Sequence, residues 1–296
     1  MDRPGSGGRR LAFVRNPHAG KGRNAGDAQE AVGRLRRAGF EVVELQGADA
    51  ESTLAQAREA VAGGLAGLVV CGGDGTAHLG VQAVAGTEVP LGVVPTGTGN
   101  DLARYLDVPR GDASAAVDRI IAGRTRTLDL ARTGSRFFVT VMAAGFDAVV
   151  NERANTMTWP RGQMRYNIAT LAELRTFAPI PYTLDLDGEI VQTEAMLVAV
   201  GNGPSFGGGL RIAEGALLDD GLLDVIVIGR MSKTRLVRTY PKLFKGSHTG
   251  EPEFTRHRVT SVTIAAPGIV AYADGERFGP LPLTIHSAPR ALKVFA

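Results

Sequence analysis

Three glycine-rich segments, each directly after a short apolar run, constrain the fold of this 296-residue chain more than any other feature. They occupy residues 16–22, 72–76 and 95–101. In an open parallel sheet, the loops at the carboxyl ends of the strands form the ligand crevice. Glycine lets backbone N–H groups in such loops approach phosphate oxygens, and a helix that follows adds its N-terminal dipole. Three such loops on one sheet edge favour a phosphorylated ligand.

The residues around these segments alternate between strand and helix patterns. Strands are predicted at residues 11–15, 40–45, 65–71 and 89–94, and helices at residues 27–38, 50–62 and 77–85. This alternation is typical of a parallel sheet that is covered by helices on both faces. We therefore expect the first half of the chain to form a doubly wound α/β domain.

The pattern changes near residue 130, after which antiparallel strands are predicted. Strand candidates lie at residues 136–142, 182–186, 189–200, 222–228, 259–265, 269–273 and 281–286, and helices at residues 163–177 and 233–244. Asp187-Gly188 separates two of these strands and is a typical two-residue hairpin turn. We expect two domains, residues 9–130 and residues 131–296, and leave open whether the last strand returns to the first domain.

Composition excludes several classes of protein. No uncharged apolar run approaches the roughly 18 residues of a membrane span, and the first residues lack the apolar stretch of a signal peptide. The single cysteine, Cys71, cannot form an intrachain disulfide and is expected to be buried. Arginine-rich segments with interleaved aromatic residues are absent, so no nucleic-acid partner is expected. We expect a cytoplasmic protein whose membrane contact, if any, is peripheral at the inner membrane face.

Two carboxylates, Asp74 and Asp101, lie inside the second and third glycine-rich segments. A carboxylate repels a phosphate unless a cation lies between them, and Mg²⁺ typically binds one or two carboxylates together with substrate phosphate oxygens. Aspartate also forms turns that hold no ligand. Because the two residues occupy comparable loop positions, the sequence favours Mg²⁺ beside a bound phosphate.

The glycine-rich segments resemble the signatures of a known kinase family. Gly72-Gly73-Asp74-Gly75-Thr76 is similar to the signature shared by diacylglycerol kinase catalytic domains, sphingosine kinases, NAD kinases and phosphofructokinase relatives. Residues 95–104, Pro-Thr-Gly-Thr-Gly-Asn-Asp-Leu-Ala-Arg, resemble the narrower second signature of bacterial diacylglycerol and related lipid kinases. Residues 16–21 resemble that family's first loop, in which Ser is usual at the position of Ala19, so this chain lacks one hydroxyl that could contact a phosphate.

The second half resembles the same family in the same order. Similar segments lie at residues 145–148, 201–203, 207–209, 217–224 and 273–276. The resemblance therefore extends from about residue 11 to the end of the chain. It implies an N-terminal nucleotide domain of the NAD kinase and phosphofructokinase type, followed by a C-terminal antiparallel β-rich domain that binds the lipid.

The resemblance also implies roles for particular residues. The ATP contacts are expected at Asn16, Pro17, His18, Ala19, Gly20, Lys21, Gln46, Gly72, Gly73, Asp74, Gly75, Thr76, Ala77, His78, Leu79, Thr98, Asn100 and Asp101. The family often has Thr at the position of Gln46, and Lys21 is equally consistent with an exposed loop residue. Asp74 and Asp101 are expected to organise the catalytic Mg²⁺. A second, structural Mg²⁺ is expected at the carboxylate of Asp220 and the carbonyls of Leu217 and Leu222.

Asp274 and Glu276 are the expected catalytic acids. Phosphorylation of an alcohol requires a group that accepts the proton of the hydroxyl, and a carboxylate within hydrogen-bond reach can do this. The family places its base in this Asp-Gly-Glu segment, and the sequence does not decide which carboxylate it is. A hairpin turn with two solvated acids is the alternative.

The resemblance implies an ATP- and Mg²⁺-dependent lipid kinase, with diacylglycerol the commonest substrate. Sphingosine, ceramide and other lipid alcohols stay open as substrates, and a homodimer stays open as the oligomeric state.

An NAD kinase is a second possible function, because Asn151-Glu152 matches a dipeptide of that family. A third possibility is a non-catalytic regulator that binds a nucleotide or a lipid. The presence of Asp74, Asp101, Asp274 and Glu276 together argues against it. The basic stretch at residues 233–245 suits anionic lipid headgroups at a membrane surface, although a solvated basic face explains it equally well.

Overall fold

The computed structural model describes residues 9–15, 23–145, 153, 157, 159 and 178–296. Its contacts divide the chain into two units. Unit 1 contains the described residues up to Leu130 together with Ala288–Ala296, and unit 2 spans Ala131–Ser287. The helix predicted at residues 163–177 and the dipeptide Asn151-Glu152 lie outside the described residues. Among the helices that the structure describes, none has the length and apolar character needed to cross a bilayer.

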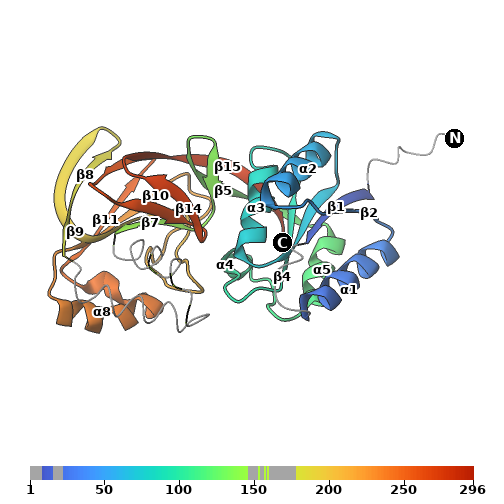
Figure 1. Cartoon of the computed structure of the whole chain (residues 1–296), viewed down its shortest axis with the longest axis horizontal. Coiled ribbons are helices and arrows are strands. Elements are labelled where there is room, and N and C mark those ends of the chain that lie inside the picture. The colour runs from blue at the N-terminus through green and yellow to red at the C-terminus, as the bar shows by residue number, and fades with distance from the viewer. Residues whose placement is uncertain (1–8, 16–22, 146–152, 154–156, 158, 160–177) are drawn as a thin grey trace. The chain divides into compact units, whose positions relative to one another are not determined.

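Unit 1 is built on a parallel sheet (Figure 1). Its strands are β1 (Arg10–Arg15), β2 (Glu41–Leu45), β3 (Gly67–Gly72) and β4 (Leu91–Pro95), in the order β2-β1-β3-β4, and the last strand of the chain, β15 (Leu283–Phe295), pairs beside β4. Its helices are α1 (Arg23–Arg37), α2 (Ala50–Ala62), α3 (Asp74–Val84), α4 (Asp101–Tyr105) and α5 (Ala113–Ala122). The predicted doubly wound α/β fold is confirmed.

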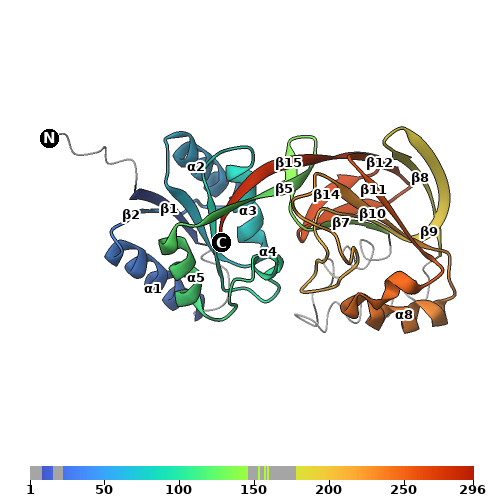
Figure 2. The same ribbon diagram turned by 180° about the vertical axis from the view of Figure 1, so that it is seen from behind.

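The two faces of this sheet carry different helices (Figures 1 and 2). Successive residues of a strand point to opposite faces. Leu91 packs against Gly80 of α3, whereas its neighbour Gly92 packs against Ile120 of α5. Helices α2 and α3 therefore cover one face, and α1 and α5 cover the other. Cys71, at the end of β3, is buried as predicted, and burial raises the pKa of its thiol to about 11.

The register of the strands brings their carboxyl ends to one edge. In the parallel pair of β1 and β3, Arg15 lies opposite Cys71. In the pair of β3 and β4, Gly72 lies opposite Pro95. The second and third glycine-rich segments begin at the last residues of β3 and β4, Gly72 and Pro95. The first segment, residues 16–22, follows β1 in the sequence and lies outside the described residues. The sheet thus brings the second and third segments to the same edge of unit 1.

Unit 2 is an antiparallel β-rich fold, as predicted. Its strands are β6 (Arg136–Phe138), β7 (Val141–Gly145), β8 (Ile180–Leu186), β9 (Glu189–Gly201), β10 (Leu223–Gly229), β11 (Phe254–Val259), β12 (Ser261–Ala265), β13 (Val270–Ala273), β14 (Glu276–Pro280) and the first part of β15. The order β14-β13-β7-β9-β8-β12-β15 forms the main path, and β10 pairs with β9 and β11. Helix α8 (Lys233–Lys245) packs against β9 and β10 (Figure 1). The 3-10 turn η2 (Ser247–Gly250) contacts α8 and β11.

Two strands belong to both units. β5 (Thr125–Thr133) begins in unit 1 and pairs with β6 in unit 2. β15 pairs with β12 through Leu283–His286 and with β4 at Val294. Where β15 passes from one unit to the other, Arg290 has a positive φ of 57° and its N–H donates to Oδ1 of Asp129 at 2.7 Å. This irregularity allows one strand to continue past Pro289.

Candidate functional site

Asp74 joins two of the glycine-rich segments in unit 1. It is the first residue of α3, and the N–H of Asn100 donates to its Oδ2 at 2.9 Å. The N–H of Asp101 donates to its Oδ1 at 2.6 Å. The carboxylate of one segment therefore holds the N-terminus of α4 in the other segment. This contact could not be read from either motif alone.

The third glycine-rich segment is further fixed by Asn100, which has a left-handed φ of 54°. The N–H of Gly97 donates to Oδ1 of Asn100 at 3.2 Å, and Nδ2 of Asn100 donates to the carbonyl of Gly97 at 2.6 Å. A side chain at Gly97 would overlap the Cα of Gly73, and one at Gly99 would overlap the carboxylate of Asp74. These two glycines are required for the packing of loop on loop, in addition to any approach to a ligand.

The remaining predicted nucleotide residues divide by exposure. Gly75, Thr98 and Gln46 are exposed, and Gly73, Asp74 and Leu79 are partly exposed. The buried ones, which support the loops, are Gly72, Thr76, Ala77, His78, Asn100 and Asp101. Gln46 follows β2 at the same sheet edge and accepts a long hydrogen bond of 3.4 Å from Arg15. Residues Asn16 to Lys21 lie outside the described residues.

The N-terminus of α3 suits an anion. Its cap residue is Gly73, which supplies no side-chain hydrogen bond to the first turn. The N–H groups of Thr76 and Ala77 are satisfied by the carbonyl of Gly73. The positive end of the helix dipole thus points toward the edge where the glycine-rich segments meet, as in other phosphate sites at helix N-termini.

Asp74 and Asp101 are compatible with a Mg²⁺ that is shared with phosphate. Asp101 is only 7% exposed, and its Oδ1 lies 3.8 Å from Nε of Arg104. No group of three or more His, Cys, Asp or Glu side chains with metal-binding geometry occurs in the described part of the chain. In phosphoryl-transfer sites Mg²⁺ typically binds one or two carboxylates, and substrate phosphates complete its coordination.

Asp220, the carboxylate expected to bind the second Mg²⁺, is bonded to protein groups in this structure. Its Oδ1 accepts the N–H of Leu222 at 3.0 Å, and its Oδ2 is paired with the guanidinium of Arg258. Nε of Arg258 also lies 3.7 Å from Oδ1 of Asp224, which is 1% exposed. A guanidinium already supplies the positive charge at this carboxylate.

The Asp-Gly-Glu segment of unit 2 forms the turn between β13 and β14. Asp274 and Gly275 have φ values of 52° and 80°, as a two-residue hairpin turn of type I′ requires. The N–H groups of Val139 and Thr140 donate to the Asp274 carboxylate, both at 3.0 Å, and Oγ1 of Thr140 donates at 2.6 Å. Asp274 is therefore occupied in fixing the turn to the segment between β6 and β7.

The same device occurs a second time in unit 2. Asp187-Gly188-Glu189 connects β8 and β9, with φ values of 51° and 97° at its first two residues. Its carboxylate accepts the N–H groups of Thr260 and Ser261 at 2.9 and 2.7 Å, and Oγ1 of Thr260 at 2.9 Å. The hydrogen bond from the Thr260 backbone is the main cause that lowers the pKa of Asp187. The two turns therefore share one architecture, in which backbone N–H groups and a threonine hydroxyl hold the carboxylate of the aspartate.

A second family segment fixes the same two residues that Asp274 holds. Nδ2 of Asn202 donates to the carbonyl of Val139 at 3.0 Å. The N–H groups of Asn202 and Gly203 donate to the carbonyl of Thr140 at 2.9 and 3.0 Å. Gly201-Asn202-Gly203 and Asp274 thus form one node around Val139 and Thr140. The sequence alone gave no reason to connect them.

The carboxylate of Glu276 takes no part in the hydrogen bonds around Val139 and Thr140. It belongs to the first residue of β14, which is exposed, and no described residue forms a hydrogen bond or ion pair with this side chain. Its strand is braced by Arg136, whose guanidinium lies 3.9 Å from the centre of the Phe278 ring and donates to the carbonyl of Arg277 at 2.8 Å. Glu276 therefore projects from a rigid hairpin and can accept a proton.

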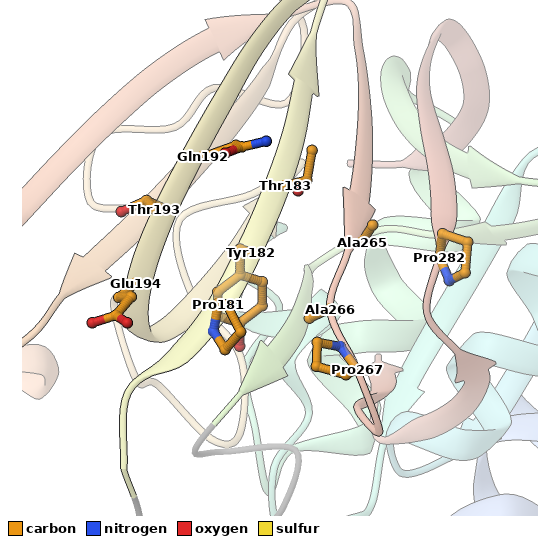
Figure 3. A pocket seen from close by; sticks show the side chains of 10 residues that line it. All are labelled: Pro181, Tyr182, Thr183, Gln192, Thr193, Glu194, Ala265, Ala266, Pro267 and Pro282. Atoms are coloured by element: carbon orange, nitrogen blue, oxygen red, sulfur yellow. The ribbon is translucent and has the colours of Figure 1, made fainter.

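A hollow elsewhere in unit 2 contains none of the predicted site residues (Figure 3). Its volume is about 700 Å³, and it is lined by Pro181, Tyr182, Thr183, Gln192, Thr193, Glu194, Ala265, Ala266, Pro267 and Pro282. Glu194 is paired with Arg230, and the hydroxyl of Tyr182 donates to the carbonyl of Ala144 at 2.9 Å. The hollow offers no group suited to phosphoryl transfer.

Comparison with known proteins gives matches over nearly the whole chain. The sequence model described as the diacylglycerol kinase catalytic domain matches residues 10–133. The model described as the YegS C-terminal NAD kinase beta sandwich-like domain matches residues 140–296. A protein of Mycobacterium tuberculosis named diacylglycerol kinase is 42% identical over 96% of this chain and 94% of its own length. One of Staphylococcus aureus with the same name is 28% identical, over 97% and 92%.

Solved structures agree on the fold. A crystal structure of a diacylglycerol kinase from Bacillus anthracis superposes with a TM-score of 0.76 at 24% identity, covering 97% of this chain and 96% of that one. An NAD kinase from Archaeoglobus fulgidus in complex with ATP superposes with a TM-score of 0.52 at 13% identity, covering 97% and 93%. At these identities the likeness establishes the fold alone.

Proposed function

Because the chain belongs to the diacylglycerol kinase family of lipid kinases, we propose that it transfers the γ-phosphate of ATP to the hydroxyl of diacylglycerol in a Mg²⁺-dependent reaction. The products are phosphatidic acid and ADP. Family membership makes the chain a kinase of lipid hydroxyls and implies ATP as its phosphoryl donor. The observation that carries the mechanism is the division of roles in one hairpin, where Asp274 is held by three hydrogen bonds and Glu276 is exposed.

On the nucleotide side, the proposal rests on the edge at which β3 and β4 end. The N-terminus of α3 and the segment at Gly97–Asn100 bind the phosphates of ATP, and Asp74 keeps these two parts in register. Asp74 and Asp101 hold Mg²⁺ together with the phosphate oxygens. When bound, Mg²⁺ neutralises charge on those oxygens during transfer. Positioning and charge neutralisation are the main requirements of phosphoryl transfer, because its transition state is loose.

On the acceptor side, Glu276 is the general base. The oxygen of the lipid hydroxyl forms a bond to the γ-phosphorus, and the bond from that phosphorus to the β–γ bridging oxygen of ATP breaks. The proton of the hydroxyl passes to the carboxylate of Glu276. Asp274 is a positioning residue, because its lone pairs face the donors of Val139 and Thr140. It keeps the hairpin, and hence Glu276, in one conformation.

The two Asp-Gly-Glu turns allow a matched test of this proposal. Glu276→Gln removes the proposed base, whereas Glu189→Gln makes the same change in the other turn. Transfer of labelled phosphate from ATP to diacylglycerol should fall by about 10²–10⁴-fold in Glu276→Gln, the usual contribution of a general base. Glu189→Gln should keep wild-type activity. Full activity of Glu276→Gln, or an equal loss in both variants, would contradict the assignment.

Sphingosine, ceramide and other lipid alcohols are the acceptors to compare with diacylglycerol in the same assay. They require the same base and the same nucleotide edge, so the acceptor alone distinguishes them.

A further inference from the structure

Helix α8 exposes an apolar stripe on its outer face. Val237 and Phe244 are 53% and 48% exposed, and Pro241 between them is also exposed. Their spacing of four and three residues places them along one side of the helix. Leu236 and Leu243 each precede a stripe residue by one position, so they lie on one flank of the stripe, and they pack in the core of unit 2. Exposed apolar side chains that gather in one patch commonly mark an interaction site.

The same helix is strongly basic. Its sequence, KTRLVRTYPKLFK, contains Lys or Arg at five positions and no acidic residue. Arg235 is paired with Glu251 and Glu253 at 3.0 and 2.7 Å, and Lys242 is paired with Glu251. Arg238 and Lys245 are exposed, and no described residue forms an ion pair with either. Each follows a stripe residue by one position, so both lie about 100° around the helix from it and flank the stripe on the same side.

A hollow of about 310 Å³ lies along this basic flank. It is lined by Ser232, Thr234, Arg235, Arg238, Thr239, Lys242 and Glu251. Because Glu251 pairs with Arg235 and Lys242, Arg238 is the lining cation that no described residue pairs. Hydroxyl groups and cationic side chains are the donors that bind phosphate oxygens. An apolar stripe flanked by cationic side chains is the composition of a helix that lies in the surface of a negatively charged bilayer.

We propose that α8 docks the protein on the surface of an anionic phospholipid bilayer. The side chains of Val237, Pro241 and Phe244 enter the boundary between headgroups and acyl chains, and Arg238 and Lys245 contact the lipid phosphates. The need for such docking rests on the proposed function, since a long-chain diacylglycerol resides in a bilayer. The docking surface itself is independent of which lipid is phosphorylated.

The test is co-sedimentation of the whole protein with vesicles that contain neither ATP nor an acceptor lipid. Wild type should bind vesicles of phosphatidylcholine with phosphatidylglycerol and not vesicles of phosphatidylcholine alone, and salt should weaken the binding. Arg238→Gln/Lys245→Gln should bind about 30-fold more weakly, since each charge near an anionic surface contributes about fivefold. Val237→Ser/Phe244→Ser should bind about tenfold more weakly, because the stripe loses apolar area.

Matched controls make the same changes elsewhere. Arg110→Gln/Arg124→Gln removes two exposed charges from unit 1, and Ile190→Ser removes an apolar side chain of β9 that is 60% exposed. Both should bind like wild type, and all variants should keep the wild-type circular dichroism spectrum and melting temperature. Equal binding of neutral and anionic vesicles by the wild type would overturn the proposal, as would equal binding by the α8 variants and the controls. If the α8 variants lose binding while no lipid is phosphorylated by the wild type, docking stands and the proposed kinase reaction fails.

Discussion

Asp274 and Glu276 are two positions apart in the chain but have different surroundings. The first accepts three hydrogen bonds from Val139 and Thr140, and the second is exposed. Sequence reasoning left the choice of base between them open. The second Asp-Gly-Glu turn supports our proposal that Glu276 is the base, because an aspartate at a type I′ turn is used in the same way at Asp187, on a hairpin that carries none of the predicted site residues.

Replacing either turn aspartate by asparagine should test this structural role. Asp274→Asn keeps the size of the side chain but weakens charge-assisted hydrogen bonds, so the free energy of unfolding should fall by about 1–3 kcal/mol. Asp187→Asn, at an exposed turn, should cost less. Urea unfolding followed by circular dichroism measures both. Only Asp274→Asn should also reduce lipid phosphorylation, because only its turn carries the base. Unchanged stability in Asp274→Asn would show that the hydrogen bonds from Val139 and Thr140 to the Asp274 carboxylate do not stabilise the fold.

The lowered pKa of Asp187 predicts how that turn responds to acid. A carboxyl group whose pKa is depressed in the folded state contributes stability above its unfolded pKa of about 3.9. That contribution is lost as the pH falls through the folded pKa. The difference in unfolding free energy between wild type and Asp187→Asn should therefore be constant from neutral pH to about pH 5 and shrink at lower pH. A difference that grows on acidification would contradict the assignment.

Arg258 should make the fold of unit 2 independent of a divalent cation. Its guanidinium is paired with Asp220, whose side chain is 19% exposed. EDTA should leave the melting temperature of the nucleotide-free wild type unchanged. Arg258→Leu leaves Asp220 without its partner, should cost about 1–3 kcal/mol, and should be partly rescued by millimolar Mg²⁺. Arg230→Leu, which breaks an exposed pair with Glu194, is the control and should cost less than about 1 kcal/mol. A drop in the wild-type melting temperature on adding EDTA would contradict this and support a bound cation at Asp220.

Among the elements, the glycine-rich loops of unit 1 depend on one another as well as on a ligand. Gly97→Ala should force the third segment away from Gly73, lower the melting temperature and weaken binding of a non-hydrolysable ATP analogue, since overpacking of this kind costs about 1–3 kcal/mol. Gly33→Ala, in α1 with open space around it, should instead stabilise unit 1 by about 0.5–1 kcal/mol. Calorimetry of both variants measures stability and binding. Wild-type affinity in Gly97→Ala would contradict loop-on-loop packing.

Most long elements could be predicted from the sequence, and the failures have local causes. Helix α3 begins at Asp74 rather than at the expected residue 77, because the backbone of Gly73 starts the helix without a side-chain cap. β14 was not predicted, because Glu276-Arg277-Phe278-Gly279-Pro280 has no strand-like alternation and pairs only through its hairpin with β13. β15 was expected to end at residue 286, but it continues through Pro289 because it leaves β12 for β4.

For the whole molecule, the ordered series of family signatures predicted the fold and the enzyme class, which the comparisons confirm. The roles of individual residues were harder to predict, because they depend on contacts between distant segments. Asn202 and Asp274 meet at Val139 and Thr140, and the carboxylate of Asp220 meets Arg258. Neither arrangement has a signal in the local sequence. The sequence motifs thus identified the family. The contacts in the structure led us to propose which motif residues hold the fold in place and which take part in the reaction.

Whether the protein phosphorylates diacylglycerol is tested most directly by a single incubation of the wild type with γ-labelled ATP, Mg²⁺, dispersed diacylglycerol and NAD. Separation of the lipid and aqueous phases identifies which acceptor takes the label. If the protein is a diacylglycerol kinase, phosphatidic acid in the lipid phase should be labelled and NADP should not. Labelled NADP without labelled lipid would contradict this proposed function.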